Sequence, residues 1–171
     1  MPRTEPTANP ARVPAWTPSG READVVEEPS AQAAARIYAR WLRGLLRFGG
    51  SVMLLAVGAV LMPAQWMNQV HQGLGLGHFP SEPITIYLAR SASALYAIHG
   101  GVLWLASTDI GRFAPLIRYM AWAGCTFAVT IFFIDRASGM PGWWTVAESL
   151  QVLAINLAFL YLLRRYRQAA R

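Results

Sequence analysis

The sequence has no lysine, a single cysteine and little charge of either sign. Only 14% of its 171 residues are charged, whereas 54% are hydrophobic. A soluble domain normally carries more charge, so this balance indicates a polytopic membrane protein. The net charge of +6 comes entirely from arginine, and the arginines stand at the ends of apolar runs. Basic residues that bind nucleic acid cluster on a soluble face, so no nucleic-acid partner is expected.

The sequence also lacks the residue patterns of a disulfide, a metal site and a phosphate-binding loop. Cys125 lies in an apolar run, has no second cysteine to pair with, and is expected to be a small buried hydrophobe. His71, His78 and Glu82 match no compact metal-ligand spacing. The glycines at 73, 75 and 77 do not follow a strand, as a phosphate-binding loop would. We therefore predict no metal, no cofactor and no catalytic constellation.

Four apolar runs are long enough to cross a bilayer. They cover residues 45–62, 84–107, 116–134 and 143–163. The sequence thus predicts an all-α fold, a bundle of four transmembrane helices within a membrane domain at residues 45–167. The glycine- and proline-rich segments 63–83 and 139–142 are the expected loops at one side. Within the first loop, Trp66, Val70 and Leu74 recur at four-residue steps, which predicts a short helix at the membrane interface.

The N-terminal region divides into two parts. Residues 1–31 are proline-rich with few apolar side chains, and they are expected to form a disordered tail. Residues 32–47 show a helical pattern in which a basic stripe, Arg36, Arg40, Arg43 and Arg47, lies opposite apolar residues. Two interpretations remain open: the helix lies along the membrane surface with its arginines toward anionic headgroups, or the arginines are the cytoplasmic flank of the first span.

The distribution of arginine predicts the topology. The N-terminal flank, the connection with Arg112 and Arg118, and the C-terminus carry nearly all arginines near helix ends, whereas the other two loops share only Arg136. By the positive-inside rule both termini are expected in the cytoplasm. The first 34 residues have no apolar stretch of a signal peptide, so the first span is expected to remain as its own insertion signal.

Arg90 and Glu148 are ionisable residues within predicted spans. Counting about 1.5 Å per residue, Arg90 lies roughly 9 Å and Glu148 about 8 Å below the same membrane side. A buried charge requires a partner, so we predict an ion pair between the second and fourth spans. The alternatives are that Arg90 reaches the outer headgroups, or pairs with Asp135 or Glu82.

His99 lies near the middle of the second span, on the side of the helix opposite Arg90. A neutral histidine hydrogen-bonded to Asn156, Thr126 or Thr130 is the structural interpretation. A proton relay, a metal ligand or a haem ligand is the functional one; a haem would need a second axial histidine, which a homodimer could supply.

The segment LARSASALYAIHGGVLWL, with an arginine near the outer end and a glycine pair after a histidine, resembles the second helix of small four-helix bacterial inner-membrane proteins, some grouped as DoxX-like. The likeness covers residues 64–163 in outline and residues 90–101 in detail. It implies a location in the bacterial cytoplasmic (inner) membrane. DoxX-like proteins are connected with quinone or sulfur redox chemistry, but no motif in this chain carries that activity over.

Two functional hypotheses follow. The first is a small non-enzymatic scaffold or accessory subunit of a membrane complex, whose partners are the lipid bilayer and either a second copy or another subunit. The second is a redox accessory or small-molecule transporter with Arg90, His99 and Glu148 lining a polar site. They differ in whether the helices enclose a cavity that reaches these residues.

Overall fold

The structure, a computed structural model, describes residues 20–171, with side chains from Ser30 onward, and every element in that range is a helix. The elements are α1 (Gly20–Leu54), α2 (Val57–Leu61), α3 (Ala64–Gly73), α4 (Pro83–Thr108), α5 (Ile110–Ala137) and α6 (Gly142–Ala169). The prediction of an all-α fold is confirmed for this part of the chain.

Three segments are long and apolar enough to cross a membrane. They are Ser30–Leu61, Ile110–Ala137 and Gly142–Ala169. The predicted second span forms α4 with almost the expected bounds, but it is not among these three segments. Arg90, His99, a glycine pair and several serines lower its mean hydropathy.

Three predicted boundaries differ from the structure. The first span, expected at residues 45–62, is divided between α1, which ends at Leu54, and α2, which begins at Val57. α1 begins at Gly20, so residues 20–31, assigned above to the tail, are helical, while residues 1–19 lie outside the described part. Glu22, Ala23, Glu27 and Glu28 are strong helix formers, which explains the earlier start.

The connection between the second and third spans, expected at residues 108–115, consists of Asp109 alone, because α4 ends at Thr108 and α5 begins at Ile110. The Asp109 carboxylate accepts a hydrogen bond from the backbone N–H of Arg112 at 3.0 Å and caps α5. Because this cap satisfies a free N–H of the first turn, the helix starts at once, and Pro115 lies inside it.

The short helix predicted in the first loop is present as α3. Trp66, Val70 and Leu74 lie along one exposed stripe of it. Gly75 and Gly77 adopt φ angles of 73° and 82°, which let the chain turn back toward α4.

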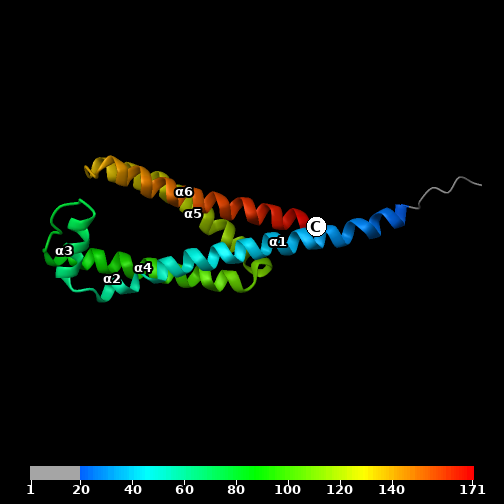
Figure 1. The fold of residues 1–171 in the computed structure, drawn as a ribbon, viewed down its shortest axis with the longest axis horizontal. Helices are drawn as coiled ribbons and strands as arrows, with labels where there is room; N and C mark the ends of the chain where they lie inside the picture. The colour runs from blue at the N-terminus through cyan, green and yellow to red at the C-terminus, as the bar shows by residue number, and fades with distance from the viewer. Residues whose placement is uncertain (1–19) are drawn as a thin grey trace, which may run out of the picture.

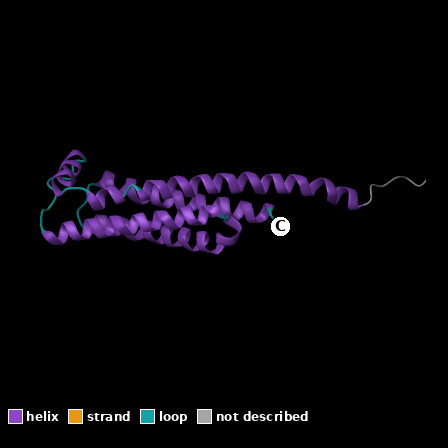
Figure 2. Ribbon diagram, turned by 90° about the horizontal axis from the view of Figure 1, so that it is seen from below, coloured by secondary structure: helices purple, strands orange, loops and turns teal. Residues whose placement is uncertain are grey.

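The long helices lie along one axis, with the loops at residues 62–83 and 138–141 together at one end (Figure 2). We call this the loop end, and the opposite end, with residues 36–43, 109–112 and 164–171, the arginine end. α4 packs along α1 and α2, while α6 packs along α5 and α1. Figure 1 shows the α1–α4 pair and the α5–α6 pair meeting near the α4–α5 turn and diverging toward the loop end.

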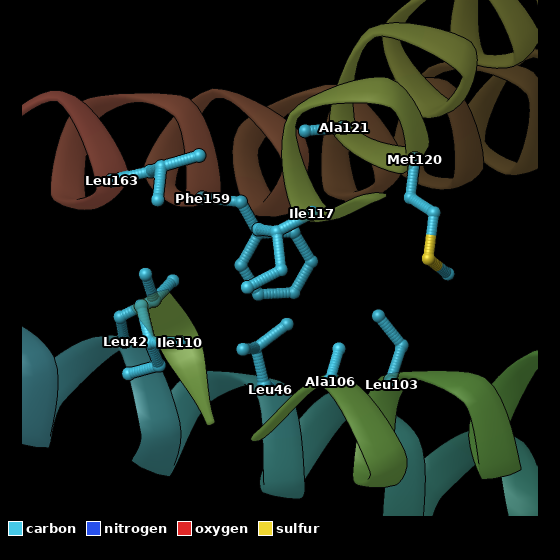
Figure 3. Close-up of a cluster of buried hydrophobic side chains, with 10 residues drawn as sticks. All are labelled: Leu42, Leu46, Leu103, Ala106, Ile110, Ile117, Met120, Ala121, Phe159 and Leu163. Atoms are coloured by element: carbon cyan, nitrogen blue, oxygen red, sulfur yellow. The ribbon is translucent and has the colours of Figure 1, made fainter. Parts of the chain in front are cut away.

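The core lies in the half of the molecule nearer the arginine end. Figure 3 shows Phe159 and Ile117 pointing from α6 and α5 toward Leu46 of α1. The rest of the cluster is Leu42, Leu103, Ala106, Ile110, Met120, Ala121 and Leu163. Many large apolar side chains remain exposed along the long helices, including Trp41, Leu88, Trp122 and Phe133. Surface this apolar suits contact with lipid or another protein.

Candidate functional site

Arg90 of α4 forms a hydrogen bond at the C-terminal end of α2. Its Nη2 donates a hydrogen bond to the backbone carbonyl of Met62, at 3.1 Å. Met62 is the C-cap residue of α2, and Pro63 after it is the N-cap residue of α3. Carbonyls at a helix end have no partner within the helix, and a nearby cation is favourable there. Arg90 thus connects α4 to the break between the first span and the loop.

Glu148 has a different partner. Its carboxylate accepts a hydrogen bond from the indole N–H of Trp144, one turn earlier on α6, at 2.7 Å. Within residues 30–171, Arg90 forms no ion pair with Glu148, Asp135 or Glu82. The predicted ion pair is therefore wrong for this structure, because α4 packs on α1 and α2 while the end of α6 that carries Glu148 diverges from it (Figure 1).

This arrangement predicts no energetic coupling between the two charges. In a double-mutant cycle of Arg90→Ala and Glu148→Ala, the coupling energy is expected to stay below about 0.5 kcal/mol, since the residues share no partner. Unfolding in mixed detergent micelles, followed by circular dichroism, measures it. A coupling well above this value would mean that the helices bring the charges together.

His99 is exposed on α4 and has no hydrogen-bond partner in the described part of the chain. The three expected partners each bond a carbonyl one turn back on their own helix. Asn156 donates to Val152 at 2.8 Å, Thr126 to Trp122 at 3.1 Å and Thr130 to Thr126 at 2.9 Å. The predicted hydrogen bond from His99 to another helix is thus absent within residues 30–171.

The four arginines of the basic stripe on α1 divide into a pair that contacts α4 and a pair that does not. Arg43 Nε donates to the carbonyl of Ser107 at 3.2 Å, and Arg47 Nε donates to its hydroxyl at 3.3 Å. The Arg47 guanidinium also lies 5.1 Å from the centre of the Trp104 ring. These contacts hold the C-terminal end of α4, whose last carbonyls lack helical partners. Arg36 and Arg40 are exposed and make no such contact.

The sequence carried a signal for this role that the prediction did not use. Arg43, Arg47, Gly50 and Leu54 follow at steps of four, three and four, so the stripe continues into the α1 face that meets α4. When a row of arginines on one helix face is followed on the same face by a glycine, that face is suited to contact a neighbouring helix as well as lipid headgroups.

Polar residues also lie along the α5–α6 contact. The Asn156 side chain occupies the space that Gly124 leaves open. Asp135 and Thr145 are buried nearer the loop end, and one oxygen of Asp135 has no hydrogen-bond partner. Of these residues the sequence singled out only Asn156, and it predicted a different contact for it.

Polar side chains of α3, with His78, hold the segment after α3 against that helix. Asn68 Oδ1 accepts hydrogen bonds from the backbone N–H of Phe79 at 2.9 Å and from Gln72 Nε2 at 3.1 Å. Gln72 Nε2 also lies 2.9 Å from His78 Nδ1, and His71 Nδ1 lies 3.0 Å from the carbonyl of Gly77. No group of three or more His, Cys, Asp or Glu side chains able to hold a metal lies within the described residues.

Two grooves mark the helix surfaces. One, of about 380 Å³, is apolar and lies between α5 and α6, bordered by Phe132, Phe133 and Leu153. The other lies between α1 and the last turn of α6. Neither is lined by Arg90, His99 or Glu148.

No family model, curated protein or solved structure matches this chain.

Proposed function

We propose that this protein is a non-enzymatic, multi-pass protein of the bacterial cytoplasmic membrane and serves as a scaffold or accessory subunit of a larger membrane complex. In this proposal α4 crosses the membrane together with the three more apolar segments, and both termini are cytoplasmic. The arginine end then faces the cytoplasm, as the positive-inside rule favours.

The length of α4 is consistent with this arrangement. Its 26 residues extend about 39 Å, more than the hydrocarbon thickness of about 30 Å. Arg90 and His99 interrupt its apolar run, which is why α4 is not among the three more apolar segments, and neighbouring protein is a favourable cover for such polar side chains.

The observation that carries the proposal is the uncovered face of α4 around His99. Leu88, Leu95 and His99 share this face at steps of seven and four residues, and all three are exposed. Toward the arginine end the same face continues into Ala106, which is buried in the hydrophobic cluster. A polar side chain at the depth of His99 is costly in contact with lipid, so a protein partner is the favourable cover.

Purification from native membranes in a mild detergent, followed by native mass spectrometry, tests the proposal. We expect the chain in an assembly larger than its own 18.8 kDa. His99→Ala should release it, because this change removes the polar group that the partner covers. Leu105→Ala is the matched control, since Leu105 is exposed on another face of α4. A chain that is monomeric with and without the substitution would contradict a role as a subunit.

The second hypothesis, a redox accessory or transporter of the DoxX-like kind, gains no support from these contacts. Arg90 and Glu148 each bond a different part of the chain, and neither groove described above reaches them.

A further inference from the structure

A groove of about 520 Å³ opens at the arginine end, between α1 and the last turn of α6. Figure 1 shows the C-terminus beside α1 at this place. The groove is open because small residues form much of its walls. Ala31, Ala35 and Ala39 line it on α1, and Ala169 and Ala170 line it at the C-terminal end of α6. The ring of Tyr166 forms its inner boundary toward the core.

Among the side chains of residues 30–171, Arg36 and Arg171 are the charged ones that line this groove, and no Asp or Glu of that range lines it. Both are exposed, and neither has a hydrogen-bond or ion-pair partner within residues 30–171. Arg43 and Arg47 differ in this respect, because they are engaged with Ser107. Two unpaired guanidinium groups on opposite walls leave a place for an anion.

The charge around the groove points the same way. Arg40, Arg164 and Arg167 are exposed nearby on the same two helices. Among the side chains described at this end, Asp109 carries the one carboxylate, and it is used to cap α5. Guanidinium groups bind phosphate oxygens with paired, charge-assisted hydrogen bonds, which makes a phosphate the anion of choice.

The depth of the groove favours a lipid over a free anion. The 28 residues of α6 extend about 42 Å, so a helix that crosses about 30 Å of hydrocarbon ends among the headgroups. Ala31, Ala35 and Ala39 give the groove an apolar wall beside Arg36, which suits the part of a lipid that follows the phosphate. We propose that this groove binds the phosphate of an anionic phospholipid headgroup, held between Arg36 and Arg171.

The test is a lipid titration of the full chain in a non-ionic detergent, read by native mass spectrometry. Phosphatidylglycerol is the probe, with phosphatidylcholine and inorganic phosphate as comparisons. The groove variant is Arg36→Gln with Arg171→Gln. The matched control, Arg40→Gln with Arg167→Gln, removes the same charge from α1 and from the C-terminal end of α6, but neither residue lines the groove. Far-UV circular dichroism and elution volume check that both variants stay folded.

We expect the groove variant to bind phosphatidylglycerol about tenfold more weakly and the control within about twofold of the wild type, since only the former loses hydrogen bonds to phosphate. Equal weakening in both variants would show a general attraction of basic surface for anionic lipid and overturn the site. Equal affinity for phosphatidylcholine would also overturn it, as would displacement of the lipid by an equal concentration of inorganic phosphate. These outcomes do not bear on the partner of α4, which is tested at His99.

Discussion

Gly100→Ala is expected to lower the free energy of unfolding by about 2–3 kcal/mol, the upper part of the range for an overpacked core. A Cβ atom at Gly100 would lie 2.6 Å from the carbonyl oxygen of Gly50 and 2.9 Å from the amide nitrogen of Leu54. Both are backbone atoms of α1, so the contact is relieved only when the two helices move apart. That movement also strains the bonds from Arg43 and Arg47 to Ser107.

Gly101→Ala is the control for this prediction. A Cβ atom there meets nothing within 4 Å, although the residue is the next one on the same helix. Both changes remove the same backbone freedom, which alone stabilises a helix by up to about 1 kcal/mol, so the difference between them isolates the helix contact. Unfolding by increasing dodecyl sulfate in mixed micelles, followed by far-UV circular dichroism, gives both values. Equal stabilities of the two variants would show that α1 and α4 are not in close contact at Gly50.

Gly124→Ala is expected to lower the free energy of unfolding by about 1 kcal/mol, the cost of the hydrogen bond that the Asn156 side chain loses. The added methyl group would overlap the amide group of Asn156, which fills the space beside Gly124. The side chain would have to swing out and give up its 2.8 Å hydrogen bond to the carbonyl of Val152. The α5–α6 contact would loosen as a result.

Asn156→Ala provides the matched second change. Alone it removes the bond to Val152, at a cost of about 1 kcal/mol. Combined with Gly124→Ala it also removes the overlap, so the double variant should be more stable than the sum of the single effects by about 1 kcal/mol or more. The same micelle unfolding measures the cycle. Additive effects would mean that Asn156 does not pack on Gly124.

Both predictions concern positions where a helix approaches its neighbour through a missing side chain. In membranes, small residues let helices pack closely, because lipid supplies little hydrophobic drive for helix association. Gly50 and Gly100 bring α1 to α4, and Gly124 brings α5 to α6. The two pairs then join through the cluster around Phe159 and Leu46 (Figure 3).

The helices themselves were largely predictable from the sequence. The expected runs 84–107 and 143–163 correspond to α4 at Pro83–Thr108 and α6 at Gly142–Ala169, and the short helix with Trp66 is present. Apolar length, proline and glycine act on the chain within a turn or two, so the local residues contain the information. The main misses were the earlier start of α1 and the single-residue connection at Asp109, where helix formers and a cap outweighed proline and arginine.

The partners of the polar residues were not predictable in the same way. Arg90 and Glu148 were expected at similar depths, but depth along an axis does not say which helices are adjacent. Arg90 bonds Met62 instead, Glu148 bonds Trp144, and His99 has no hydrogen-bond partner within residues 30–171. The sequence by itself determined that the chain forms long apolar helices, where most of the loops between them fall, and which helix ends carry arginine. Tertiary structure decided the contacts, because helix rotation and crossing depend on the close approaches at Gly50, Gly100 and Gly124.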